Sequence, residues 1–144
     1  MRIVDANLLI YAFDGESPFH DQSRTWLEGI YREDDLVGLP PATLVAFARI
    51  TTNPRAMRVA ASPTQAIDSI KRLIEHPKSH VLECGPRHWD LFRTVVLRSG
   101  VFGPSMTDAH LATLAIEHGA LLCSHDEGFR RYQGLRFENP LVTF

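Results

Sequence analysis

Residues 107–126 read TDAHLATLAIEHGALLCSHD, and this stretch decides the class of fold. The part from Asp108 to His118 is strongly apolar over about three helical turns, which predicts a helix buried near the centre of the molecule. The apolar run Leu121 to Cys123 follows it and predicts a buried strand, with Asp126 three residues further on. A helix that leads into a buried strand is the repeating unit of a parallel α/β sheet.

The remainder of the chain repeats this alternation of short apolar runs and helical segments. Further strands are expected at Ile3-Val4, Leu36 to Leu39 and Val81-Leu82. Helices are expected after Ser17-Pro18, from about Pro41 to Thr51, after a capping box formed by Ser62 and Gln65, and from Pro86 to Gly100. The alternation predicts an α/β fold whose central parallel sheet is covered by helices on both faces.

Length and composition narrow the class of protein. With 144 residues, 44% of them hydrophobic, we expect a single domain over residues 1–144. A formal net charge of −2 argues against a protein that coats nucleic acid, because such binding needs an excess of cations. No apolar run approaches the roughly 20 residues of a membrane span, so we expect a cytoplasmic protein without a membrane partner.

Three aspartates occupy related positions in the predicted fold. Asp5 directly follows the first strand, Asp126 comes after the strand at Leu121 to Cys123, and Asp108 lies in the first turn of the apolar helix. Strand carboxyl ends and helix amino ends gather at one edge of a parallel sheet, where ligands bind. Carboxylates that converge there offer the oxygen ligands that Mg²⁺ prefers, and the metal could activate a water to attack a phosphodiester.

Each acid also has a purely structural interpretation. Asp5 and Asp126 are good helix-capping or turn residues, and Ser105 with Asp108 fits a capping box. Asn7 and Ser124 are candidates to orient the carboxylates or waters, although each could simply cap a turn. Cys84 and Cys123 lack metal-ligand spacing, so we expect both to be buried, and the scattered histidines do not predict a metal site.

With the three acids placed, the chain resembles the PIN-domain proteins, specifically the VapC toxins of VapBC toxin–antitoxin pairs. The resemblance covers nearly the whole chain. It rests on IVDAN at residues 3–7, LVAFARITTNPR at residues 44–55, TDAHLATLAIEHG at residues 107–119, and the segment 124–140 with its Asp126, Phe129 and Asn139-Pro140.

The resemblance implies a three-layer Rossmann-like PIN domain and an endoribonuclease that depends on Mg²⁺ or Mn²⁺. It assigns metal binding and catalysis to Asp5, Asp108 and Asp126. It also implies an RNA substrate, inhibition by a cognate VapB-type antitoxin, and a homodimer or a higher toxin–antitoxin assembly. Five arginines are candidate contacts to RNA phosphates or antitoxin carboxylates, namely Arg49, Arg55, Arg58, Arg130 and Arg131.

Two departures from the family pattern bear on the metal. Ala46 stands where the family has a glutamate in the central helix, and Gly128 stands where a further acid is frequent. We therefore expect one metal ion rather than two. The same losses motivate an alternative, a catalytically weak PIN module that acts mainly as a protein- or RNA-binding partner. A phosphotransfer domain with Asp5 as nucleophile is disfavoured, since Asn7 occupies the position where a second acid would follow.

Overall fold

The protein is described by a computed structural model that covers residues 1–142. Its five short strands are β1 (Arg2–Val4), β2 (Val37–Leu39), β3 (Ser79–Val81), β4 (Leu121–Cys123) and β5 (Arg136–Glu138). They form one sheet in the order β3-β2-β1-β4-β5, and every neighbouring pair is parallel. The strand order reverses between β1 and β4, and such a switch point opens a crevice at the carboxyl ends of the two strands.

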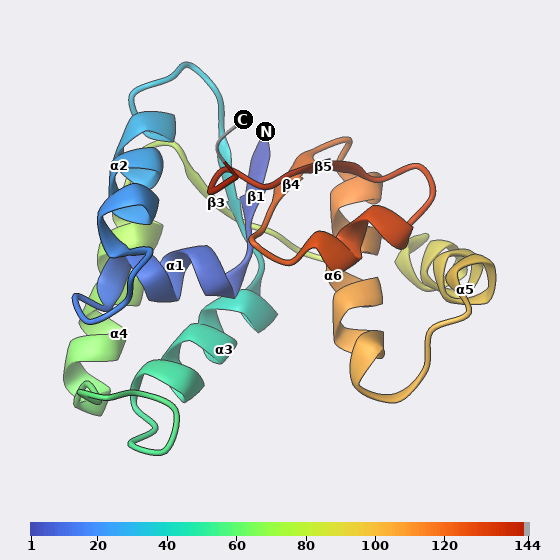
Figure 1. Ribbon diagram of the computed structural model, residues 1–144. Coiled ribbons are helices and arrows are strands. Elements are labelled where there is room, and N and C mark those ends of the chain that lie inside the picture. Colours follow the sequence, from blue (N-terminus) through green and yellow to red (C-terminus); the bar gives the residue numbers. More distant parts are fainter. Residues whose placement is uncertain (143–144) are drawn as a thin grey trace.

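Helices cover both faces of the sheet, so the fold has three layers (Figure 1). One face carries α1 (Ala6–Phe13), α2 (His20–Ile30), α3 (Pro41–Thr51) and α4 (Pro63–Glu75). The other carries α5 (His88–Ser99) and α6 (Met106–Glu117). Two short 3₁₀ helices, η1 (Gly103–Ser105) and η2 (Glu127–Arg131), precede α6 and follow β4. The predicted α/β class with a helix-covered parallel sheet is confirmed.

The central strands β1 and β4 contribute side chains to two separate apolar cores. Ile3 and Leu122 pack in the core beneath α5 and α6, whereas Val4 and Cys123 pack in the core beneath α1 to α4. Neighbouring residues of a strand point to opposite faces, so each strand contributes to both cores. All four side chains are fully buried, which explains why the two strands read as continuous apolar runs.

Several helix signals in the sequence are confirmed. The Ser62 hydroxyl accepts a hydrogen bond from the Gln65 backbone N–H at 3.2 Å, and the Gln65 side chain accepts one from the Ser62 N–H at 2.9 Å. This pair is the predicted capping box of α4. The predicted end of α5 is also present. The helix is capped by Gly100, whose φ of 70° is the left-handed conformation that glycine adopts without strain.

Other local predictions were wrong or incomplete. The sequence did not predict α1, whose apolar residues lack helical periodicity, or β5, whose three residues include only one apolar side chain. The Ser105–Asp108 capping box does not form, because Ser105 has helical backbone angles and its hydroxyl makes no capping bond. Asp108 is therefore not tied up in capping α6. Within residues 1–142, no helix combines the length and apolar character that crossing a bilayer requires.

Gly38 allows a close approach at the centre of the sheet and provides a test of the packing. A Cβ at this position would lie 2.9 Å from Leu82 Cδ1, 3.0 Å from Ile3 Cγ1 and 3.1 Å from Met1 Sδ. We expect Gly38→Ala to lower the free energy of unfolding by about 1–3 kcal/mol, as overpacking of a core does. Urea unfolding would measure this. Gly15→Ala is the control, since a Cβ there meets nothing within 4 Å, and equal stability of the two variants would contradict the packing described here.

Candidate functional site

The sequence-predicted residues meet at the carboxyl ends of β1 and β4. Asp5 immediately follows β1, and its backbone N–H donates to the Cys123 carbonyl oxygen at 3.0 Å, which continues the ladder between the strands. Ser124 and Asp126 follow β4 in the same way. Asp108 approaches from the first turn of α6. Three elements that are far apart in the sequence thus supply one acidic site.

The buried Ser124 hydroxyl connects the polar side chains of this site. It donates to Asp5 Oδ2 at 2.7 Å and accepts from Asn7 Nδ2 and from the Asp126 backbone N–H, both at 3.0 Å. Asn7 Oδ1 accepts from the His125 backbone N–H at 3.3 Å. A hydroxyl has one donor and two acceptor sites, so the hydrogen-bonding capacity of Ser124 is fully used. Asp5, Asn7 and the backbone of Asp126 are therefore held in fixed relation.

Two of the acids also cap local structure. Asp5 Oδ1 accepts from the Ala6 N–H at 2.7 Å at the start of α1, and Asp126 Oδ1 accepts from the Gly128 N–H at 2.8 Å at the start of η2. The capping interpretation and the site interpretation are compatible, because each carboxylate uses one oxygen for the cap. Within residues 1–142, the second oxygen of Asp126 and both oxygens of Asp108 make no hydrogen bond.

The carboxylates disturb one another electrostatically. Burial raises the pKa of Asp5, the hydrogen bonds from Ser124 and Ala6 oppose this change, and the charge of Asp126 adds to it. Burial also raises the pKa of Asp108, with further increases from Asp126 and Asp5. Both pKa values are raised chiefly by burial, and the charges of the neighbouring carboxylates add a smaller increase.

The five arginines proposed as contacts have different surroundings. Arg131 lies at the acidic site, since its charge lowers the pKa of Asp108. Arg130 pairs with Glu127 at 2.5 Å, and Arg58 pairs with Glu16 at 3.7 Å. Arg58 also shares a surface hollow with Asn7. The remaining two, Arg49 and Arg55, are exposed and form no ion pair within the described part of the chain.

Neither of the two positions that depart from the family pattern contributes a carboxylate to the site. Ala46 is half-buried within α3. A Cβ at Gly128 would lie 2.9 Å from Asp126 Oδ1, so a larger residue here would require the Asp126 carboxylate to shift.

The expectation that both cysteines are buried was wrong for Cys84, which is exposed, and right for Cys123. The sequence did not predict a histidine metal site, and the structure brings together a group of possible metal ligands: Cys84 Sγ and one ring nitrogen each of His88 and His110 lie within 4.8 Å of one another. These residues come from separate elements. The four-residue spacing of Cys84 and His88 was the one local signal in the sequence.

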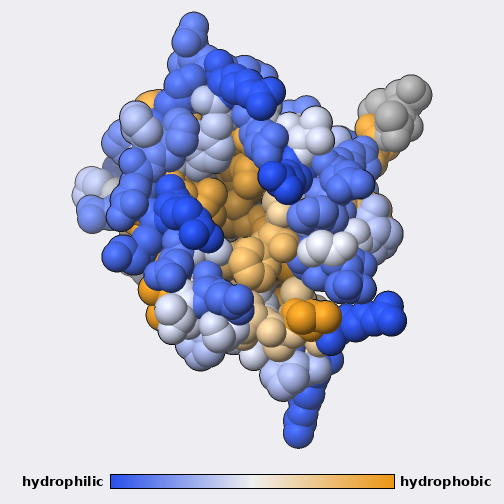
Figure 2. All heavy atoms as spheres, turned by 90° about the vertical axis from the view of Figure 1, so that its left-hand side faces the viewer, coloured by the Kyte–Doolittle hydropathy of each residue, from blue (hydrophilic) through white to orange (hydrophobic). Residues whose placement is uncertain are grey.

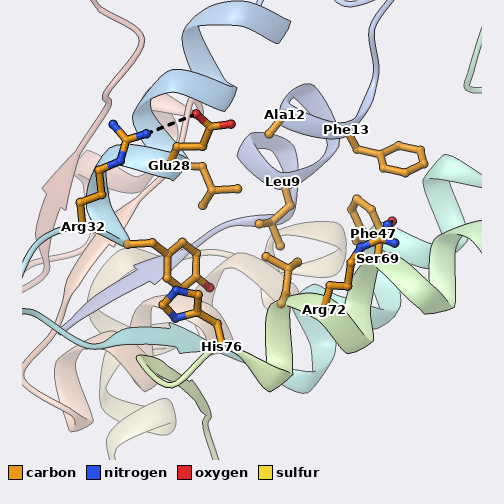
Figure 3. Close-up of a pocket in the computed structure, with 12 residues that line it drawn as sticks. Leu9, Ala12, Phe13, Glu28, Arg32, Phe47, Ser69, Arg72 and His76 are labelled. Atoms are coloured by element: carbon orange, nitrogen blue, oxygen red, sulfur yellow. Dashed lines mark hydrogen bonds and ion pairs between the residues drawn. The ribbon is translucent and has the colours of Figure 1, made fainter.

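Sequence reasoning also missed an apolar hollow of about 510 Å³ among α1, α2, α3 and α4. Figure 2 shows hydrophobic side chains at its floor and hydrophilic side chains around its rim. Leu9, Phe13 and Phe47 lie inside it, while Glu28 and Arg32 form an ion pair at 3.9 Å on its edge (Figure 3). Its lining residues come from four separate helices, so no local sequence pattern indicated it.

The three-layer fold and the acid cluster at its switch point define the class of protein. Residues 2–135 match the family model described as PIN domain, and the chain belongs to this family. It is also 36% identical over 141 residues to Ribonuclease VapC43 of Mycobacterium tuberculosis, covering 98% of this chain and 96% of the relative. Within the PIN domain family, the chain therefore belongs to the VapC ribonucleases, which confirms the family expected from its motifs.

Solved structures share the fold at low sequence identity. The VapBC2 structure from Rickettsia felis, bound to a DNA fragment from its promoter, matches with a TM-score of 0.69 and 15% identity over 96% of this chain and 97% of that one. A toxin–antitoxin complex from Klebsiella pneumoniae matches with a TM-score of 0.66 and 12% identity over 99% of this chain and 100% of that one. At these identities the likeness concerns the fold alone.

The crowding of carboxylates makes a prediction about stability without added metal. We expect Asp108→Asn to raise the free energy of unfolding at neutral pH by up to about 0.5 kcal/mol, a small gain because water screens this half-exposed group. The folded-state pKa of Asp108 is raised, so the wild type loses stability as pH rises through that pKa. The advantage of the variant should thus vanish below the ordinary aspartate pKa of about 4.

Urea unfolding across this pH range, in the presence of a chelator, measures the difference. Asp68→Asn, on the exposed face of α4, is the matched control. If Asp108→Asn is less stable than the wild type at neutral pH, the unfavourable burial and repulsion of the Asp108 carboxylate described here are wrong.

Proposed function

We propose that this VapC-family chain is a divalent-metal-dependent endoribonuclease, with Asp5, Asp108 and Asp126 holding one Mg²⁺ that Mn²⁺ can replace. The observation that carries the proposal is that Asp5 after β1, Asp108 in α6 and Asp126 after β4 lie near enough at one sheet edge for their charges to act on one another. The fit to a hard cation rests on the donors themselves, which are carboxylate oxygens with lone pairs left over after capping. The pKa values of Asp5 and Asp108 are raised by burial first and by neighbouring acids second, and a cation would offset both effects by favouring the ionised carboxylates.

A bound Mg²⁺ would supply Lewis-acid activation of water and charge neutralisation at a phosphodiester. The chain's own residues prepare the site for it. Ser124 holds Asp5 through its hydroxyl and fixes the backbone at Asp126, so the two acids need little rearrangement on binding. Asn7 Nδ2 donates a second hydrogen bond to the same hydroxyl and restrains it further.

Arg131 is the arginine best placed to act near the reacting phosphate. Its Nε donates to the Gly128 carbonyl oxygen at 3.0 Å, which anchors the guanidinium beside Asp108 and Asp126. A guanidinium in this position can hold a phosphate oxygen of RNA through paired hydrogen bonds. We assign Arg58, beside Asn7, to the approach of the RNA strand rather than to the acids.

The first test is metal-dependent cleavage of total bacterial RNA. We expect cleavage with Mg²⁺ or Mn²⁺, and we expect Asp5→Asn and Asp108→Asn each to reduce its rate at least about 100-fold, because metal catalysis is worth several kcal/mol. Asp68→Asn should cleave like the wild type. Circular dichroism would establish that all variants fold.

Equal cleavage by wild type and both acid variants would refute the assignment of these residues. The alternative, a catalytically weak binding module, predicts folded protein that binds RNA but neither binds Mg²⁺ in calorimetry nor cleaves. Membership of the VapC ribonucleases supports the enzyme over this alternative.

We further propose that the partner is a VapB-type antitoxin, and that an apolar segment of it occupies the hollow among α1 to α4. The solved toxin–antitoxin complex with the same fold supports a partner of this kind. The hollow itself supplies the argument for the location, since its floor is apolar and its rim carries Glu28, Arg32 and Arg72 for polar contacts (Figure 3).

Leu27→Arg tests this location because Leu27 lines the hollow. We expect the variant to bind the antitoxin encoded beside its gene at least about tenfold more weakly. Binding would bury the introduced guanidinium without an opposite charge, which is unfavourable. Leu97→Arg, at an exposed leucine of α5, should bind normally. Surface plasmon resonance measures both, and unchanged binding by Leu27→Arg would exclude the hollow as the docking site. The expected homodimer remains a prediction that light scattering of the same samples would check.

A further inference from the structure

Cys84, His88 and His110 form a second cluster of possible metal ligands, separate from the three aspartates. Cys84 lies in the loop between β3 and α5, His88 is the first residue of α5, and His110 lies in α6. Cys84 Sγ and one ring nitrogen from each histidine lie within 4.8 Å of one another. One thiol and two imidazoles from three segments therefore face a common point.

The two histidines are spaced as metal ligands would be. His88 Nε2 lies 3.1 Å from His110 Nδ1. Two nitrogens bound to one tetrahedral Zn²⁺ at about 2.0–2.1 Å would be about 3.4 Å apart. At this distance a single hydrogen bond joins the two rings. A small separation of the two rings would admit an ion in place of that proton.

The carboxylate of Glu117 contacts the ring nitrogen of His88 that faces away from His110. Glu117 Oε2 lies 2.7 Å from His88 Nδ1, and Glu117 Oε1 accepts a hydrogen bond from the Gly85 backbone N–H. If Nδ1 carries the proton and donates to Glu117, the lone pair of His88 Nε2 points toward His110. Metal-binding histidines in proteins commonly donate their other N–H to a carboxylate in this way, which fixes the tautomer and ring orientation. Glu117 and His110 both belong to α6, so one rigid helix supplies a ligand and the group that orients another.

The surroundings provide both shelter and access. His88 is fully buried, and the rings of Trp89 and Phe92 pack around it with centroid distances of 4.9 Å and 6.3 Å. Cys84 is exposed, so an ion can enter from solvent on that side. Three protein ligands leave a fourth position of a tetrahedral ion for water.

We propose that Cys84, His88 and His110 bind a zinc-type transition-metal ion, with Glu117 orienting His88. Thiolate and imidazole donors favour Zn²⁺ and related ions, whereas the aspartates favour Mg²⁺, so the two sites select different metals. The ion would tie the loop before α5 to α6, two residues beyond Asp108. It would thereby fix the amino-terminal turns of the helix that carries one of the catalytic acids.

The test uses the full chain carrying Asp5→Asn and Asp108→Asn, so that the acidic site does not contribute. After treatment with a chelator, calorimetry should detect one equivalent of Zn²⁺, and Co²⁺ should produce the absorption band of a thiolate–cobalt bond. Adding Cys84→Ala should abolish that band and weaken Zn²⁺ binding more than tenfold. Removing a group that only orients a ligand already weakens metal binding about 10–100-fold, so removing a ligand should cost at least as much. Cys84 is exposed, so this variant should still fold.

Two further variants refine the assignment. Glu117→Gln should retain the thiolate–cobalt band but bind Zn²⁺ about 10–100-fold more weakly, as expected for a carboxylate that orients a ligand. His80→Ala, at an exposed histidine of β3 outside the cluster, should bind like the parent. The proposal is wrong if the parent binds no stoichiometric Zn²⁺, if Co²⁺ binds without a thiolate band, or if Cys84→Ala binds Zn²⁺ as tightly as the parent. None of these outcomes depends on RNA cleavage.

Discussion

The parallel pairing of β1 with β4 is the interaction on which the site depends. It sets Asp5 beside Ser124, residues 119 positions apart in the sequence, and the Ser124 hydroxyl then spans the gap between the two chain segments. Because the chain passes from β1 outward to β2 and β3 and only later returns to β4, the pairing also creates the switch point. Asp5 and Asp126, which follow these two strands, therefore lie at the crevice between them.

The cost of this arrangement is electrostatic. Burial and mutual repulsion raise the pKa values of Asp5 and Asp108, so the charges that make the site useful work against the folded state. The apolar cores on either side of the sheet offset this cost, since fully buried residues such as Ile3, Val4 and Leu122 anchor the strands that carry the acids. Sites of this kind are typical of proteins in which function, rather than stability, determines the residue.

The sequence predicted most of what depends on local chemistry. The capping box at Ser62, the glycine at position 100 and the buried strands at residues 3–4 and 121–123 all have short-range signals, and all are present. β5 was missed because pairing with β4, rather than its own residues, makes Arg136–Glu138 a strand. The meeting of Asp5, Asp108 and Asp126 could be predicted because parallel sheets place such residues at one edge. The meeting of Cys84 with His110 could not, because it depends on how α5 packs against α6.

The burial of α6 has a consequence for how proteins of this kind can diverge. Ala109, Ala112 and Ala115 are completely buried at spacings of three residues, so the helix packs closely in the core that includes Ile3 and Leu122. Larger side chains there would push the helix outward and carry Asp108 with it, which leaves these positions little freedom to change. Leu27 and Arg72, which line the hollow on the opposite face, belong to α2 and α4, and these two helices carry none of the three aspartates of the site. A duplicated gene could therefore acquire a new protein partner by substitutions around the hollow while its chemistry stays the same.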